Sequence, residues 1–109
     1  MDTETTVLVA PRAPAERRRS KREDVRADVL MLGEDSRLSG IRLLNLSEDG
    51  FMAVTDTDQE SEGGVAIDLP VVGWCQADIV WVLGDRVGAA FRRPLDPHAL
   101  HAVVREFAR

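Results

Sequence analysis

The residues best suited to hold an anion lie together in the stretch ERRRSKRE, from Glu16 to Glu23. An arginine guanidinium forms a planar fork that matches phosphate oxygens or the edge of a guanine, and it can also stack on a purine. Four arginines of this stretch are close enough in sequence to converge on one such group: Arg17, Arg18, Arg19 and Arg22. Taken alone, a basic run is more typical of a solvated tail or a non-specific phosphate patch.

The distribution of charge indicates what size of anion to expect. Between Arg12 and Arg26 there are seven basic and three acidic residues, whereas the whole chain of 109 residues has a formal net charge of −5. An acidic surface disfavours long nucleic acids, which bind mainly through many phosphate contacts. A small basic site on such a surface suits a small anion better.

A second polar stretch, NLSEDG from Asn45 to Gly50, ends one apolar run and begins the next. Asn45 and Ser47 are two residues apart, so on an extended strand their side chains point to the same face. That face gains an amide and a hydroxyl, which suit the hydrogen bonding of a polar ligand. Gly50 permits a positive φ at the turn. The alternative is a plain Asx or Ser turn between two strands.

The elements that must position these two stretches are predicted to be β-strands. Every second residue from Val25 to Met31 is apolar, which is the period of a half-buried strand. Turn signals separate six apolar runs, as in an antiparallel sheet or a small barrel. Gly84-Asp85 predicts a tight hairpin turn, and Gly88 indicates a bulge or a close backbone approach. The expected strands are 25–32, 41–46, 51–55, 65–69, 74–83 and 86–92.

The period changes near the C-terminus. Pro94 and Pro97 end the sheet, and Asp96 is suited to cap a helix that has Pro97 at its first position. Apolar residues then recur at the spacing of an amphipathic helix: Leu100, Val103, Val104 and Phe107. At the other end of the chain, residues 1–15 are expected to form a flexible tail.

Other kinds of chemistry lack the residues that they need. His98 and His101 are three apart on the predicted helix, with no obvious cysteine or carboxylate partner for a metal. The one cysteine, Cys75, is expected to be a buried, inert thiol. The sequence has neither a nucleophile elbow nor a phosphate loop, so we expect no enzyme and no cofactor. No apolar run approaches the roughly 18 residues of a membrane span, and the N-terminus does not resemble a signal peptide, so a cytoplasmic location is the simplest.

Together the two polar stretches are more specific than either alone. Arg18 and Arg22 form an RxxxR motif, and Asn45, Ser47 and Gly50 form a [D/N]xSxxG motif, with one predicted strand between them. In these motifs, and in the pattern ADIVW…GDRVGAAFRRPLD, the chain resembles the PilZ domain, the bacterial receptor module for cyclic di-GMP. The resemblance covers roughly residues 16–107.

The resemblance implies an all-β fold, a six-stranded antiparallel β-barrel with a C-terminal α-helix. It divides a domain at 16–109 into an arginine-rich ligand-binding segment at 16–24, a barrel at 25–93 and a helix at 96–108. It also implies a receptor that changes its surface when cyclic di-GMP binds and then signals to a separate, unidentified effector protein. Neither a nucleic acid polymer nor a membrane is expected as a partner.

The site residues follow from the matching motif positions. The resemblance implies that Arg18 and Arg22 contact the guanine and phosphate groups from a segment that folds over the barrel wall. Asn45 and Ser47 would contact a guanine, and Gly50 would shape the turn. Further candidates for ligand contacts are Arg17, Arg19, Trp81, and Arg92 or Arg93.

Trp81 and three motif positions need separate comment. For Trp81 the favoured interpretation is a core tryptophan, and the alternative is stacking on a guanine. Asn45 replaces the commoner aspartate, so it can accept from a guanine but without a charge-assisted hydrogen bond. Lys21 stands where proline is common and leaves the backbone less preset. Asp49 stands where a second glycine is common and adds an acid near an anion site.

Two other functions stay open at this point. One is an adaptor with the PilZ fold that binds no nucleotide and acts only through protein contacts. The other is a general nucleic-acid binder, although the acidic remainder of the chain and its few aromatic residues count against it. In a receptor, we expect the arginine segment to be mobile without ligand and to close over one dinucleotide or an intercalated pair.

Overall fold

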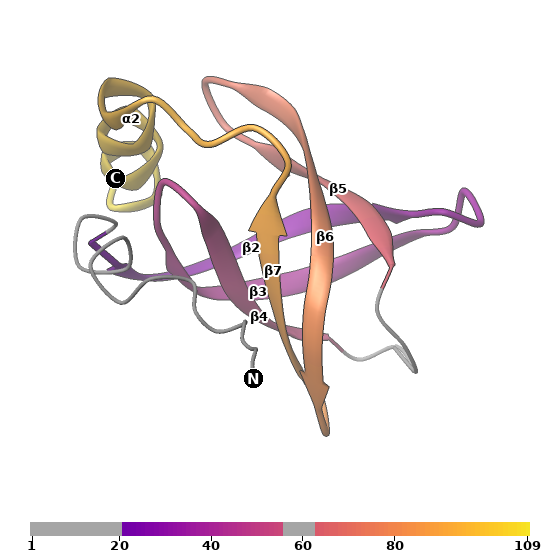
Figure 1. Ribbon diagram of the computed structural model, residues 1–109. Coiled ribbons are helices and arrows are strands. Elements are labelled where there is room, and N and C mark those ends of the chain that lie inside the picture. The colour runs from indigo at the N-terminus through magenta and orange to yellow at the C-terminus, as the bar shows by residue number, and fades with distance from the viewer. Residues whose placement is uncertain (1–20, 56–62) are drawn as a thin grey trace, which may run out of the picture.

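The computed structural model describes residues 21–55 and 63–109. They form a closed antiparallel barrel of six strands followed by one helix, which confirms the expected fold class (Figure 1). The elements are β2 (Glu23–Gly33), β3 (Leu38–Leu46), β4 (Gly50–Thr55), β5 (Gly64–Leu69), β6 (Gly73–Leu83), β7 (Arg86–Phe91) and α2 (Pro97–Phe107). The expectations for the tail 1–15 and for Arg17, Arg18 and Arg19 lie outside the described residues.

The strands follow one another around the barrel in the order β2-β3-β4-β7-β6-β5. Strand β2 closes the barrel, because it pairs with β3 along most of its length and with β5 through Met31–Gly33. All six predicted strands are present. The largest difference in bounds is at β3, which begins at Leu38 because Leu38 still pairs with Leu32 across the hairpin. Gly84 has φ 63° in the two-residue turn between Leu83 and Arg86, as predicted.

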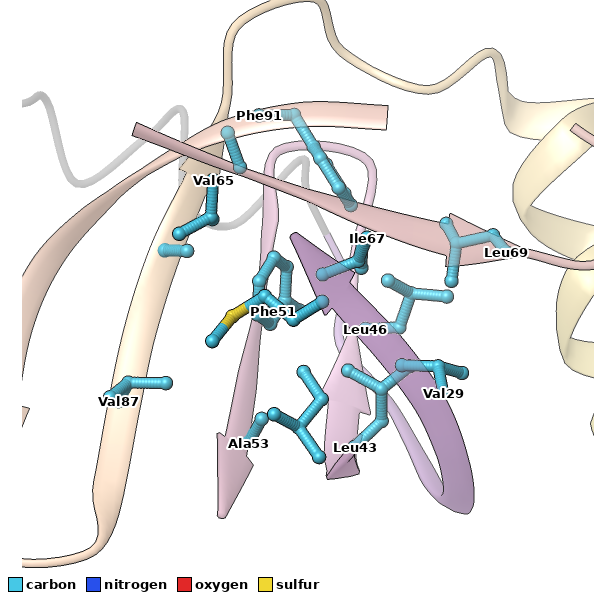
Figure 2. Packing of buried hydrophobic residues seen from close by; sticks show 14 of the residues in the cluster. Val29, Leu43, Leu46, Phe51, Ala53, Val65, Ile67, Leu69, Val87 and Phe91 are labelled. Carbon is cyan, nitrogen blue, oxygen red and sulfur yellow. The ribbon is translucent and has the colours of Figure 1, made fainter. Parts of the chain in front are cut away.

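The core fills the barrel with side chains from every strand (Figure 2). Strands β4 and β5 both bury every second residue, which is the period expected of a strand with one face in the core. The rings of Phe51 and Phe91 pack with their centroids 5.7 Å apart. Each large side chain buried here stabilises the fold by about 1.5–3 kcal/mol relative to an exposed one. The largest fully buried side chains are Leu43, Leu46, Ile67, Leu69, Val87 and Val103.

Helix α2 lies at one end of the barrel and against β2 (Figure 1). Asp96 caps it as predicted, because its side chain accepts a hydrogen bond of 2.7 Å from the His98 backbone N–H. Leu100 and Val103 are buried, while Val104 and Phe107 are half-buried against the core. The amphipathic pattern therefore attaches the helix to the barrel. In the described part of the chain, no helix has the length and apolar character needed to cross a membrane.

Candidate ligand-binding site

The NLSEDG stretch forms a tight serine turn between β3 and β4. The Ser47 hydroxyl accepts hydrogen bonds of 3.2 Å from the backbone N–H groups of Asp49 and Gly50 and donates one of 3.4 Å to the Gly50 carbonyl. Strand β3 ends at Leu46, so Ser47 lies in the turn and not beside Asn45 on an extended strand. Ser47 is buried, and its hydroxyl holds the turn in shape.

Gly50 is required for a different reason from the one expected. Its φ is not positive, since the described glycines with positive φ are Gly73 and Gly84. Gly50 instead pairs with Ala90 of β7, and a Cβ on Gly50 would overlap the carbonyl oxygen of Ala89. The glycine therefore allows β4 and β7 to approach closely at the motif.

The serine turn is fixed to the C-terminal part of the chain. The Asp49 carbonyl accepts a 2.8 Å hydrogen bond from the Phe91 N–H at the end of β7. The Glu48 carbonyl accepts a 2.8 Å hydrogen bond from the Leu95 N–H, in the segment that leads into α2. This segment also contains Arg93, which is exposed. Backbone hydrogen bonds therefore connect the serine turn both to the end of β7 and to the segment that precedes α2.

Asn45 lies in a row of residues that crosses five neighbouring strands on the outside of the barrel. Asn45 pairs with Asp24 of β2 on one side and with Met52 of β4 on the other. Met52 pairs with Gly88 of β7, and Gly88 pairs with Trp81 of β6. We call these five residues the outer row. They are Asp24, Asn45, Met52, Gly88 and Trp81, and they bring an amide and an aromatic ring onto one surface.

Trp81 is not a core residue, so the favoured interpretation was wrong. Trp81 is 40% exposed, and its indole covers Gly88 so closely that a Cβ on Gly88 would overlap the ring. The cause is a register irregularity between Ile79 and Trp81, which turns Trp81 outward although Ile79 faces the core. The close approach predicted at Gly88 is thus confirmed. The exposed indole is a surface on which a purine can stack.

Arg22 lies at the edge of the same region. It is exposed and directly precedes Glu23, which pairs with Leu46, the residue before Ser47. The antiparallel register therefore brings one arginine of the RxxxR motif to the serine turn. The other arginine of the motif, Arg18, lies outside the described residues.

A comparison with protein families gives the decisive observation, since the family model of the PilZ domain matches residues 16–109. The chain belongs to the PilZ domain family. PilZ domains are binding and adaptor modules rather than enzymes, and the family is known for binding cyclic di-GMP. A comparison with curated proteins finds no match.

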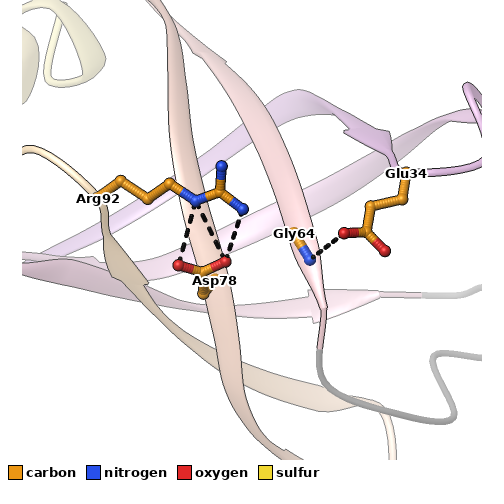
Figure 3. Close-up of polar contacts among 4 residues, drawn as sticks. All are labelled: Glu34, Gly64, Asp78 and Arg92. Atoms are coloured by element: carbon orange, nitrogen blue, oxygen red, sulfur yellow. Dashed lines mark hydrogen bonds and ion pairs between the residues drawn. The ribbon is translucent and has the colours of Figure 1, made fainter.

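On this PilZ barrel, Arg92 is turned away from the outer row. Its guanidinium holds Asp78 of β6 in a two-pronged contact, with a shortest distance of 2.9 Å (Figure 3). Next to this pair, Glu34 accepts a 3.2 Å hydrogen bond from the Gly64 N–H. Arg92 thus joins β6 to the end of β7, while Arg93 is the arginine on the segment held to the serine turn.

The Asp78–Arg92 pair of the PilZ barrel gives a testable pH effect. The hydrogen bond from Arg92 lowers the pKa of Asp78 below its usual range. A lowered pKa favours the folded state above the ordinary carboxyl pKa, and this contribution is lost as the pH falls through the folded-state value. Arg92→Met should therefore raise the pKa of Asp78, as followed by carbon-13 NMR of its carboxyl group. Arg42→Met, which removes the comparable partner of Asp28, should leave the pKa of Asp78 unchanged.

Within 21–55 and 63–109, the histidines and the cysteine of the PilZ domain form no second centre. His98 and His101 are exposed, and the described residues include no group of three or more His, Cys, Asp or Glu side chains placed to hold a metal ion. Cys75 is only partly buried, but burial raises the pKa of its thiol and Asp68 raises it further. The thiol therefore stays protonated near neutral pH, which is the condition of an unreactive cysteine.

Three members of the outer row were not predicted from the sequence as site residues: Gly88, which was expected only to mark a bulge or a close backbone approach, Met52 and Asp24. In the sequence, Met52 is indistinguishable from an ordinary strand residue. Only its pairing with both Asn45 and Gly88 places it between the Asn45 amide and the Trp81 indole. In the sequence, Asp24 is simply an acidic residue next to the basic stretch, and only the β2–β3 register brings it opposite Asn45. Neither Met52 nor Asp24 gives a local signal, because cross-strand pairing is a property of the folded sheet.

Proposed function

We propose that this PilZ domain is a receptor for cyclic di-GMP, which binds over the serine turn and the outer row. The observation that carries the proposal is the register between β2, β3 and β4. It brings Arg22 to the serine turn and sets Asn45 in one row with the exposed indole of Trp81. The chemistry of the ligand, two phosphates and two purines, matches these groups.

Each proposed contact has its own physical basis. Arg18 and Arg22 would take the phosphates and the guanine edges with their planar forks, with Arg17 and Arg19 as further cations. Asn45 would hydrogen-bond a guanine, and Trp81 would stack on one. Ser47 would contribute mainly by shaping the turn, because its hydroxyl already bonds three backbone groups there.

The proposed output is a change of surface that a separate effector protein recognises. Ligand would draw the arginine segment onto the barrel, as an anion orders a cationic segment in other switches. The backbone bonds from Glu48 to Leu95 and from Asp49 to Phe91 supply a direct path from the serine turn to the segment before α2. The partner would read the new surface of the arginine segment and the start of the helix together.

One alternative has a specific observation in its favour. Asp24 and Asp49 are both exposed and bring two acids close to the proposed anion site, while Asn45 supplies no carboxylate. These features suit an adaptor that binds no nucleotide and works through protein contacts alone.

A calorimetric titration of the full chain with cyclic di-GMP separates the two functions. We expect saturable heat together with a rise in the thermal midpoint, because a ligand that binds only the folded state stabilises it. If neither heat nor a thermal shift is observed, the receptor proposal fails and the adaptor is favoured. Addition of unrelated RNA at physiological salt should not displace the ligand, since non-specific phosphate binding falls steeply with salt.

A further inference from the structure

Asp24 lies directly opposite Asn45 in the register of β2 and β3. Their chain neighbours Val25 and Leu46 are buried in the core, so Asp24 and Asn45 both point to the outside of the barrel. Residues directly opposite each other on one face of an antiparallel pair have Cβ atoms about 5 Å apart. The Asp24 carboxylate and the Asn45 amide are therefore immediate neighbours on the surface.

The two side chains complement each other as hydrogen-bonding groups. An amide offers one acceptor oxygen and two N–H donors, whereas an ionised carboxylate offers two acceptor oxygens and no donor. The Watson–Crick edge of guanine has the N1–H and N2 amino donors beside the O6 acceptor. Asn45 alone can satisfy O6 and at most one donor group. A carboxylate next to it can accept from the N2 amino group.

A negative charge at Asp24 lies next to a proposed site for an anion, where it is unfavourable unless it makes a contact that offsets the repulsion. Asp24 is exposed, and within residues 21–55 and 63–109 it has neither a hydrogen-bond nor an ion-pair partner. An unpaired acid next to a site for a doubly charged anion repels the ligand through space. The Asp24 carboxylate favours binding only if it accepts hydrogen bonds from donor groups of the ligand. Removal of the carboxylate therefore weakens binding if Asp24 contacts the ligand and strengthens binding if Asp24 only repels it.

We infer that Asp24 is a specificity residue that reads the N2 amino group of guanine and supplies the carboxylate that Asn45 lacks. The inference rests on the proposed function, since it concerns the same ligand site. It assigns the guanine edge to a pair of residues from two strands, with the amide on β3 and the carboxylate on β2.

The test compares cyclic di-GMP with cyclic di-IMP, which differs only by the absence of the N2 amino group from each of its two bases. Affinities are measured by calorimetry for the unmodified chain, for Asp24→Asn and for Asp28→Asn. Asp28 is a matched control, because it is an exposed aspartate farther along β2 whose partner is Arg42. The thermal midpoints of all three proteins confirm that each is folded.

The unmodified chain should bind cyclic di-GMP about ten-fold more tightly than cyclic di-IMP, as expected for a hydrogen bond to a charged acceptor. Asp24→Asn should weaken the binding of cyclic di-GMP about ten-fold. It should leave the binding of cyclic di-IMP unchanged or make it slightly tighter, because with this ligand Asp24 only repels. The preference for cyclic di-GMP therefore disappears. Asp28→Asn should keep the full preference.

Two results overturn the inference while leaving the receptor in place. One is an Asp24→Asn protein that keeps the preference of the unmodified chain. The other is an Asp24→Asn protein that binds cyclic di-GMP more tightly, because Asp24 would then only repel the ligand. A failure of the unmodified chain to bind cyclic di-GMP is a different outcome, which overturns the proposed function and this inference together.

Discussion

Gly50→Ala is expected to destabilise the fold by about 3 kcal/mol, because a Cβ at this position overlaps the Ala89 carbonyl of the neighbouring strand. The overlapping atom is backbone, and Ala89 is held in the β4–β7 ladder, so it cannot move away as the end of a side chain would. Relief requires β4 and β7 to separate next to the serine turn. Urea denaturation measures the loss as a lower midpoint at an unchanged slope.

Gly40→Ala is the matched control for this prediction. Gly40 also lies in a strand, β3, but a Cβ there meets no atom within 4 Å. The same chemical change should therefore be neutral, or it should stabilise by roughly 0.5 kcal/mol through a less flexible unfolded chain. Equal losses for the two variants would show that the close approach at Gly50 is not the cause.

Arg22→Ala is expected to weaken cyclic di-GMP binding about 100-fold, because it would remove the proposed forked, charge-assisted contact to the ligand. Arg22 is exposed and has no partner among the residues that the structure describes. Its removal should therefore leave the stability of the barrel unchanged. Calorimetric titration gives the affinity, and thermal unfolding checks the stability.

Arg37→Ala controls for the loss of one positive charge. Arg37 lies in the turn between β2 and β3, where it contacts Asp35, at the other end of β2 from Arg22. We expect Arg37→Ala to change the affinity for cyclic di-GMP less than two-fold, because an exposed charge that is farther from the ligand than the Debye length of about 8 Å is largely screened. Similar losses for both variants would mean that only net charge attracts the ligand and that Arg22 makes no specific contact.

The barrel could be predicted from the sequence because its signals are local. Alternating residues in Val25–Met31 mark a strand, Gly84-Asp85 marks a hairpin, and Asp96 followed by Pro97 marks the start of the helix. Each of these signals lies within a few residues of the element that it predicts. The structure contains all three features.

The candidate site could be predicted only in part, because two register irregularities control which side chains face outward. Strict alternation from Leu43 would turn Asn45 into the barrel, and strict alternation from Ile79 would do the same to Trp81. An irregularity between each pair reverses this, so that Asn45 and Trp81 share the outer surface. Such irregularities depend on the pairing of strands that are distant in the sequence, and the residues around Asn45 and Trp81 give no local signal of them.

Gly50 shows a related limit of sequence interpretation. A glycine at the end of NLSEDG suggests a positive φ, which is the common reason for glycine in a turn. The actual reason is the approach of β7, a strand that begins 36 residues later along the chain. The motif residue was found from the sequence, but its physical role required the fold.

The central claim is that cyclic di-GMP binds across the serine turn and the outer row. Amide correlation spectra of the nitrogen-15-labelled full chain, recorded with and without cyclic di-GMP, test it most directly. We predict shifts for Arg22, Asn45, Ser47 and Gly88 and for the Trp81 indole N–H, while Ala66 on the far strand β5 stays unchanged. Spectra without any shift, or with shifts confined to the face of β5, would contradict the account.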